Sequence, residues 1–207
     1  SEMSVVDVAS GKVTSRVKVG EEPAGVGVRP GDAEVYVTSE SDSEVAAIDT
    51  ASFKVLSEIK TSARPRGVAF TSDGKTAFIT NENGGTVTVI NAETNKVVTT
   101  IAMPKVKGAP APPRPMGMAF SQDGGTLFVS LGRAGAIAKI DVATRKVTGT
   151  FDTVGARPWG IALSADGQKL YSANGPSGDV SVIDIATGKV DTHIATGGSP
   201  WGVVVRP

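Results

Sequence analysis

The stretch Pro65-Arg66-Gly67-Val68-Ala69-Phe70 opens a unit that the chain repeats. The same Pro-x-Gly step, followed by apolar residues, begins at intervals of 42, 50, 43 and 42 residues, at Pro23, Pro65, Pro115, Pro158 and Pro200. A second marker recurs with the same period, at Asp7, Asp49, Asn91, Asp141 and Asp184. Each of these residues stands at the start of a turn, where its side chain is expected to bond to the backbone of that turn. Two independent landmarks in step indicate one structural unit copied along the chain.

Outward from Pro65, the repeat reads as four short strands separated by turns rich in Gly, Asp and Asn. The expected strands are Gly67–Phe70, Thr76–Thr80, Thr86–Ile90 and Lys96–Ile101. Their alternation of polar and apolar residues is that of half-buried strands. A period in the low forties built from four antiparallel strands is typical of a β-propeller blade.

The sequence therefore predicts an all-β fold, with one β-propeller domain over residues 1–207. Four complete four-stranded blades are predicted at 23–64, 65–114, 115–157 and 158–199. Residues 1–22 match the third and fourth strands of a further, partial blade, and residues 200–207 match a closing first strand, so a composite fifth blade would lack its second strand. Two arrangements fit: a ring of about five blades, or part of a larger ring with open edge strands.

Composition excludes several functional classes. Lys and Arg total 21, as do Asp and Glu, so no net charge draws the chain to nucleic acid or to a membrane surface. No apolar run is long enough to span a membrane. Cysteine is absent and His193 is the single histidine, so neither a Ser-His-Asp triad nor a Cys- or His-rich metal site can be built. We therefore predict no catalytic residues and no metal site.

The ends of the second strands carry a family resemblance. The motifs Tyr36-Val37-Thr38-Ser39-Glu40, Phe78-Ile79-Thr80-Asn81-Glu82 and Tyr171-Ser172-Ala173-Asn174 resemble the YVTN-family β-propeller repeat, and the resemblance covers the whole chain. It implies a periplasmic or extracellular protein, and it implies seven blades for the larger ring of which this chain could be a fragment. Related propellers include surface-layer proteins, the haem-binding domain of cytochrome cd1 nitrite reductase, and proteins encoded near quinone-cofactor dehydrogenases. The resemblance does not specify a cofactor for this chain.

One repeat carries an insertion of eight residues, roughly 104–111. Its Pro and Gly content predicts a loop. Insertions in repeat proteins tend to fall on a functional face. A rigid surface loop is the alternative interpretation.

In the geometry that the resemblance implies, the residues flanking each Pro-x-Gly step, the insertion and one further loop meet at the channel mouth. The predicted ligand-binding residues are Arg64, Arg66, Lys105, Lys107, Arg114, Arg133, Arg157, Trp159 and Trp201. Guanidinium groups favour carboxylates or phosphates, and indole faces favour flat rings or bases. Alternatively, the Arg-Pro corners only cap neighbouring blades, bonding carbonyls or pairing with Glu40, Glu82 or Asp179.

We thus predict a non-catalytic binding propeller whose basic, Trp-containing channel mouth takes a small anionic ligand or a protein partner. Arg64, Arg114 and Arg157 are expected to converge on the anion. A nucleic acid fits the same side chains with less support, because the net charge is zero. Two other hypotheses stay open: a quinone- or haem-associated oxidoreductase-like propeller, and a surface-layer or adhesion module that self-associates through open blade edges.

Overall fold

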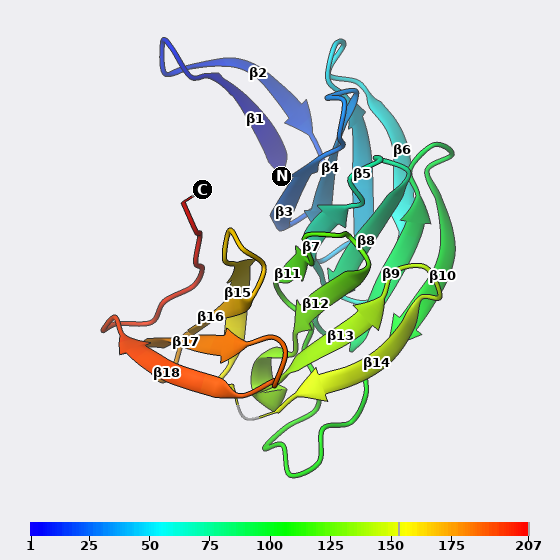
Figure 1. Ribbon diagram of the computed structural model, residues 1–207. Helices are drawn as coiled ribbons and strands as arrows, with labels where there is room; N and C mark the ends of the chain where they lie inside the picture. The colour runs from blue at the N-terminus through cyan, green and yellow to red at the C-terminus, as the bar shows by residue number, and fades with distance from the viewer. Residues whose placement is uncertain (153, 207) are drawn as a thin grey trace. The chain divides into compact units, whose positions relative to one another are not determined.

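The computed structural model describes residues 1–152 and 154–206 (Figure 1). In this described part every regular element is a β-strand, apart from the 3-10 turn η1 (Gly132–Ala134). None of the described residues belongs to a helix that could cross a membrane. The chain forms two compact units, which we describe separately: residues 1–84 with 88–100, and residues 85–87 with 101 onward.

The first unit begins with a two-stranded sheet, formed by β1 (Glu2–Asp7) and β2 (Lys12–Lys18). A four-stranded sheet follows, made of β3 (Pro23–Val28), β4 (Glu34–Ser39), β5 (Glu44–Asp49) and β6 (Val55–Lys60). The next sheet contains β7 (Pro65–Phe70), β8 (Thr76–Asn81), β9 (Thr86–Asn91) and β10 (Lys96–Ala102). Each strand lies beside its neighbour in sequence.

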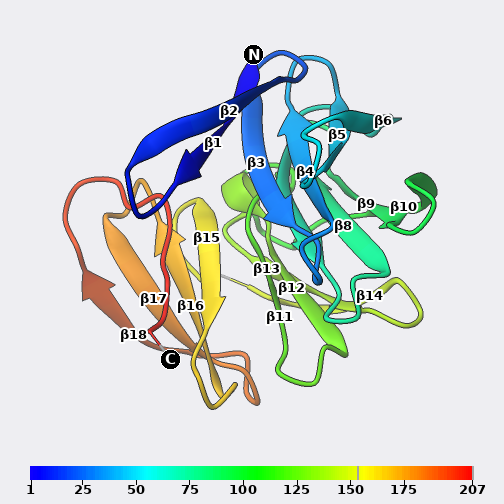
Figure 2. The same cartoon turned by 90° about the horizontal axis from the view of Figure 1, so that it is seen from above.

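The second unit contains two more four-stranded sheets. One is made of β11 (Met118–Phe120), β12 (Thr126–Ser130), β13 (Ile137–Asp141) and β14 (Lys146–Phe151). The other is made of β15 (Pro158–Leu163), β16 (Lys169–Asn174), β17 (Asp179–Asp184) and β18 (Val190–Ala195), which lie side by side in Figure 2. The prediction of four complete four-stranded sheets, preceded by a partial one, is confirmed.

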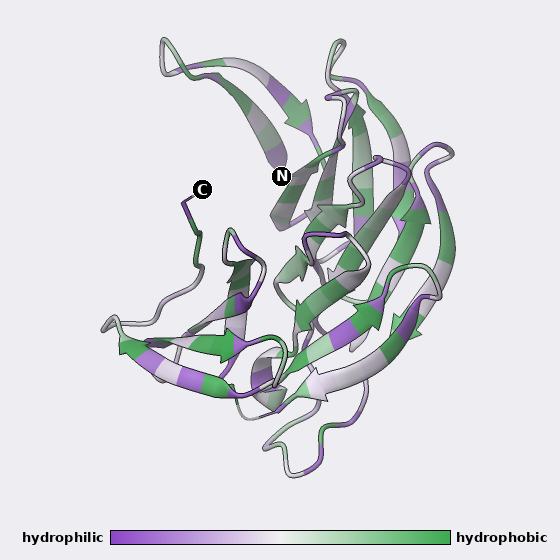
Figure 3. Cartoon of the chain, viewed as in Figure 1, coloured by the Kyte–Doolittle hydropathy of each residue, from purple (hydrophilic) through white to green (hydrophobic). Residues whose placement is uncertain are grey.

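Apolar residues in bands along the strands (Figure 3) bring neighbouring sheets together within each unit. In the first unit Tyr36 of β4 meets Phe70 of β7 edge to face, with ring centroids 4.8 Å apart. In the second, Phe128 of β12 and Phe151 of β14 pack with Ile161 of β15 in one buried cluster. Within each unit, neighbouring sheets thus bury their faces against one another, as adjacent modules of a repeat protein do.

The repeated aspartates organise the turns as expected. Asp49 Oδ1 accepts hydrogen bonds from the N–H and the hydroxyl of Ser52, at 2.7 and 2.5 Å. Asp141 makes the same pair of bonds with Thr144. These side chains replace backbone partners that a tight turn leaves unpaired, so the scaffold role is confirmed.

The predicted closing strand at 200–207 is not seen as a strand in residues 200–206, and Pro207 lies outside the described residues. The segment nevertheless begins as a first strand does. Gly160 N–H donates to the Trp201 carbonyl at 3.1 Å, repeating the bond from Gly117 N–H to the Trp159 carbonyl, also at 3.1 Å. A first strand takes its hydrogen-bond ladder from a second strand, as β15 does from β16, and no strand of the described residues pairs with this segment.

The inserted segment, residues 104–111, is a loop between β10 and β11, as predicted. A turn bond from Ala109 N–H to the Val106 carbonyl, 3.2 Å long, shapes it.

Candidate ligand-binding site

The corner before β7 in the first unit holds two of the predicted cations, Arg64 and Arg66, on either side of Pro65. Arg64 Nε lies 2.6 Å from a carboxylate oxygen of Glu40 and 3.4 Å from one of Glu82. Arg66 Nε lies 2.8 Å from Glu82, and its Nη1 contacts Glu40. Each arginine therefore bridges both glutamates.

This four-residue network compensates its own charge. Glu40 and Glu82 are buried, and the Arg66 side chain is 19% exposed. The Glu40 carboxylate raises the pKa of Arg64, because it accepts a hydrogen bond from the guanidinium. In this unit, the arginines of the Arg-Pro corner serve the blades themselves, which is the capping alternative with Glu40 and Glu82.

The equivalent acids are missing from the second unit. Glu40 and Glu82 each follow directly on the second strand of a sheet, after β4 and β8. At the same place after β12 and β16 stand Leu131, which is fully buried, and Gly175. Cations that reach these two corners therefore meet no repeat-encoded carboxylate.

Gly175 instead makes room for an indole. A Cβ at Gly175 would lie 2.2 Å from Trp159 Cζ3, so the ring packs directly on the glycine backbone. Trp159 stands where Arg66 stands in its repeat. Its ring centroid is 4.3 Å from that of Trp201, at an interplanar angle of 44°. Trp201 itself is 59% exposed.

Trp159 in turn holds Arg157, the residue before Pro158. The Arg157 Cζ lies 5.2 Å from the Trp159 ring centroid, a cation–π contact that orients a guanidinium without neutralising it. The backbone of Arg157 is left-handed, with φ 53°, like that of Arg64 at φ 61°. Its Nε is buried and has no hydrogen-bond partner among residues 1–152 and 154–206.

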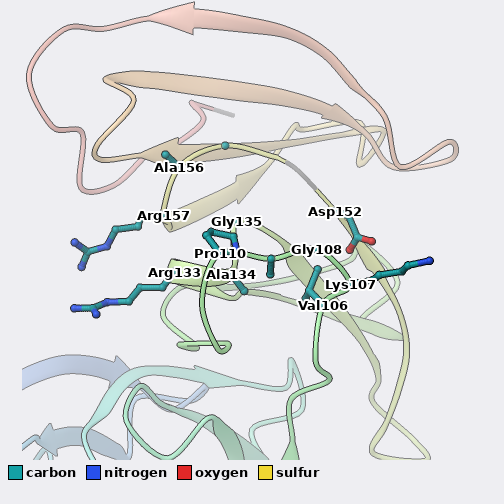
Figure 4. A pocket seen from close by; sticks show the side chains of 12 residues that line it. Val106, Lys107, Gly108, Pro110, Arg133, Ala134, Gly135, Asp152, Ala156 and Arg157 are labelled. Atoms are coloured by element: carbon teal, nitrogen blue, oxygen red, sulfur yellow. The ribbon is translucent and has the colours of Figure 1, made fainter.

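Arg157 lines a cavity of about 350 Å³ together with Arg133, Lys107 and Asp152. In Figure 4 the Arg133 and Arg157 side chains extend in the same direction, whereas Lys107 and Asp152 lie on the opposite side. Within the described chain, neither Arg133 nor Arg157 forms an ion pair with an acid.

The short turn η1 places Arg133 at this cavity. Leu131 N–H donates to the Ala136 carbonyl at 2.9 Å, and Gly135 N–H donates to the Gly132 carbonyl at 2.9 Å. Gly132 is required here, because a Cβ would lie 2.6 Å from the Arg114 carbonyl oxygen. The turn thus pins the backbone on both sides of Arg133 and leaves its side chain exposed.

The predicted site residues therefore fall into separate groups in the structure. The structure brings Lys107, Arg133 and Arg157 to one cavity, with Trp159 in contact with Arg157 and Trp201 in contact with Trp159. Lys105 lines a separate hollow of about 500 Å³ formed by the insertion. Arg114 donates its backbone N–H to the Leu131 carbonyl at 2.9 Å. Because Arg64 belongs to the other unit, its expected convergence with Arg114 and Arg157 stays a prediction.

Several residues of the site were not among those predicted from the sequence, and two of them bear on its charge and its packing. Asp152 lines the cavity, and Gly175 supports Trp159. Gly175 has a readable signal, since the position after the second strand reads Glu, Glu, Leu, Gly from one repeat to the next. Asp152 has no such signal. Among the described residues, no three His, Asp or Glu side chains gather as metal ligands.

The chain is similar to several solved structures. They include a functionally unknown protein from Desulfotomaculum acetoxidans, with a TM-score of 0.82 and 18% identity over 99% of this chain and 66% of that one. Kuenenia stuttgartiensis hydrazine synthase has a TM-score of 0.75 and 23% identity, over 89% of this chain and 52% of that one. Dihydro-heme d1 dehydrogenase NirN in complex with DHE has a TM-score of 0.77 and 18% identity, over 96% of this chain and 42% of that one.

At these identities the similarity shows the fold alone, and the chain spans between 42% and 66% of each relative's length. No curated protein matches the chain. The narrower YVTN assignment stays a prediction. A family model described as "Lactonase, 7-bladed beta-propeller" matches residues 51–205, three quarters of the sequence. The chain therefore belongs to the seven-bladed β-propeller lactonase family.

Proposed function

We propose that this chain binds a small anionic ligand at the cavity of the second unit, through Arg133 and Arg157. One observation carries the proposal: two guanidinium groups line a single cavity, and within the described residues no acid pairs with either. The paired arginines of the first unit are the internal contrast, because Glu40 and Glu82 occupy them.

The chemistry of the guanidinium group supports a carboxylate or phosphate oxygen as its partner. A planar fork of N–H donors matches two oxygens at once, and such charge-assisted bonds are about twice as strong as neutral ones. The buried Nε of Arg157 lacks an acceptor in the described chain, and an unpaired buried donor costs about 1–3 kcal/mol. Because Nε has no accessible surface, a ligand oxygen would bind this guanidinium through its Nη nitrogens.

The proposal changes the composition of the predicted site. Arg64 and Arg66 leave it, because their charge is compensated within the first unit. Arg157 and Arg133 stay as ligand-binding residues. Trp159 becomes a positioning residue, which sets the direction of Arg157 through the cation–π contact.

The test is isothermal titration with acetate, hexanoate and inorganic phosphate as probes. For the probe that binds most tightly, the double variant R133A/R157A should bind at least tenfold more weakly, since each lost charged hydrogen bond is worth about 1.5–3 kcal/mol. The variant R16A/R145A is the matched control, because it removes the same charge away from the cavity. Unchanged affinity in R133A/R157A, or no saturable binding of any probe, would overturn the proposal.

A second candidate function is lactone hydrolysis, which the family match over residues 51–205 favours. Water would add to the acyl carbon of a cyclic ester, the ring C–O bond would break, and a hydroxy carboxylate and a proton would result. The carboxylate of that product is the group that paired arginines bind. Proton release from δ-valerolactone in weakly buffered solution, compared between wild type and R133A/R157A, tests this function. If the rate with wild-type protein equals that of the buffer alone, the hydrolysis candidate is wrong and the binding proposal is unaffected.

The haem-associated hypothesis has one further support, the similarity to a haem d1 dehydrogenase solved in complex with DHE. Trp159 and Trp201 contact each other at a tilt of 44°, and the exposed Trp201 ring offers an apolar face of the kind that conjugated rings favour. An absorption spectrum after addition of haem provides the test. A shifted Soret band that R133A/R157A and W201A both abolish would support this candidate over a simple anion.

A further inference from the structure

We infer that the ligand of this cavity is an amphiphilic monocarboxylate, an acid with an apolar body of several carbons. The inference rests on the proposed function, since it requires the anion to sit at Arg133 and Arg157. It adds that the apolar body of the ligand occupies the cavity and accounts for most of the difference in affinity between one anion and another.

The cavity walls are apolar. Val106, Ala109 and Pro110 of the insertion line it, and so do Ala134 of η1 and Ala156. Such walls offer no partner to hydroxyl groups or to extra phosphate oxygens, and burying those groups without a hydrogen bond is costly. Methylene groups are favoured in the same space.

Glycines keep the space open. Gly108, Gly135 and Gly155 all line the cavity, and all have positive φ angles of 74°, 67° and 156°. A Cβ at Gly135 would lie 3.1 Å from the Gly155 carbonyl oxygen. Because glycine adopts these backbone angles without strain, the loops can turn sharply around the cavity and contribute no side chain to it.

The backbone of the wall is already hydrogen-bonded to itself. Val154 N–H donates to the Gly135 carbonyl at 2.9 Å, and Ala109 N–H donates to the Val106 carbonyl at 3.2 Å. Neither group needs a ligand as a partner. The polar side chains of the described lining are Arg133 and Arg157 on one side and Lys107 and Asp152 on the other (Figure 4).

This distribution of charge favours a single negative group. Arg133 and Arg157 supply an uncompensated positive pair, whereas Lys107 and Asp152 carry opposite charges on the far side. A ligand with a second carboxylate there would meet Asp152 as well as Lys107. A monocarboxylate with its head at the arginines and its chain along the apolar walls meets no such repulsion.

The test is a chain-length series of acetate, butanoate, hexanoate and octanoate, titrated into the wild-type protein with inorganic phosphate as comparison. Each CH₂ buried should tighten binding up to about fourfold, the value expected from its transfer free energy, until the cavity is full. Hexanoate should therefore bind at least tenfold more tightly than acetate or phosphate.

Two single variants localise the effect. A156L and A109L each place a larger side chain at the cavity, and either should weaken hexanoate binding at least fourfold while acetate binding stays the same. A51L adds the same atoms to an exposed turn of the first unit and should change neither. Circular dichroism and thermal unfolding establish that each variant is folded.

The outcomes separate the inference from the proposed function. If R133A/R157A weakens every anion but chain length has no effect, the arginine site stands and the amphiphilic ligand is wrong. Tighter binding of phosphate than of hexanoate also overturns the inference. If R133A/R157A changes nothing, the proposed function itself fails.

Discussion

The corner before β7 and the corner before β15 have nearly the same sequence, but they differ in how the charge of their arginines is compensated. The first reads Arg64-Pro65-Arg66-Gly67, and the second reads Arg157-Pro158-Trp159-Gly160. In the first, two buried glutamates hold both arginines. In the second, a tryptophan packs on a glycine, and the remaining arginine faces a cavity. The residue that follows the second strand thus distinguishes a corner whose arginines are paired with acids from a corner whose described residues provide no such pair.

The two corners also differ in what holds them together. In the first, the arginine side chains are 41% and 19% exposed, and every charge has an opposite partner. Removing the acids would leave partly buried cations unpaired, which is costly. The second corner depends on ring packing and on a cation–π contact, worth about 0.5–2 kcal/mol according to its exposure. We therefore expect mutations to affect stability in the first corner and binding in the second.

The largest effect is predicted for E40A/E82A, which removes both acids of the first corner. Unfolding free energy should fall by about 2–4 kcal/mol, somewhat less than for a fully buried pair, because Arg64 and Arg66 would remain in place without partners. Urea denaturation followed by circular dichroism measures this change.

The matched control is E2A, which breaks the exposed ion pair between Glu2 and Arg16 in the same unit. Exposed pairs contribute about 0–1 kcal/mol, so E2A should be close to wild type. An E40A/E82A protein as stable as E2A would mean that the network does not support the corner.

The substitution G175E places a glutamate after β16, at the position that Glu82 occupies after β8 in the first corner. Its side chain would collide with the Trp159 ring, and such overpacking typically costs about 1–3 kcal/mol. A new carboxylate beside Arg157 would also compete with any bound anion. Thermal unfolding and hexanoate titration should therefore both report a loss.

G202A is the control for G175E, since a Cβ at Gly202 meets nothing within 4 Å. It should change stability by less than about 0.5 kcal/mol, like other substitutions in open space. If G175E retains both wild-type stability and anion affinity, Trp159 does not depend on the glycine.

The smallest effect concerns the turn aspartates, which differ between the units. The Ser52 hydroxyl lowers the pKa of Asp49, and the Lys169 ammonium, 2.8 Å away, lowers the pKa of Asp184 further below its ordinary value. A depressed carboxyl pKa stabilises the fold above the unfolded value near 3.9, and this contribution is lost as pH falls through the folded pKa. Asp184 should thus keep its contribution to a lower pH than Asp49.

Carboxyl carbon NMR between pH 5 and pH 1.5 measures both titrations. The midpoint of Asp184 should lie below that of Asp49, and K169M should bring the two together. Equal midpoints in the wild-type protein would show that the ion pair with Lys169 does not persist in solution.

Much of the fold was predictable because its causes are local. The predicted strand Thr76–Thr80 is observed as Thr76–Asn81, and Thr86–Ile90 is observed as Thr86–Asn91. Alternating side chains and Gly-Asp turns within a few residues specify such hairpins. The site was predictable only in part. The repeat marked Arg157 as a corner residue, but whether an acid reaches it depends on Gly175, which directly follows β16.

By itself, the sequence determined the period, the four-stranded units, the turn aspartates and the loss of the acid after β12 and β16. These features follow from residues that are near one another along the chain. Only the tertiary structure decided that Arg66 meets both Glu40 and Glu82, and that Lys107 of the insertion shares a cavity with Arg133 and Arg157. Ion pairs and cavities form between residues far apart in sequence, so they depend on how the sheets pack and not on the pattern of any one strand.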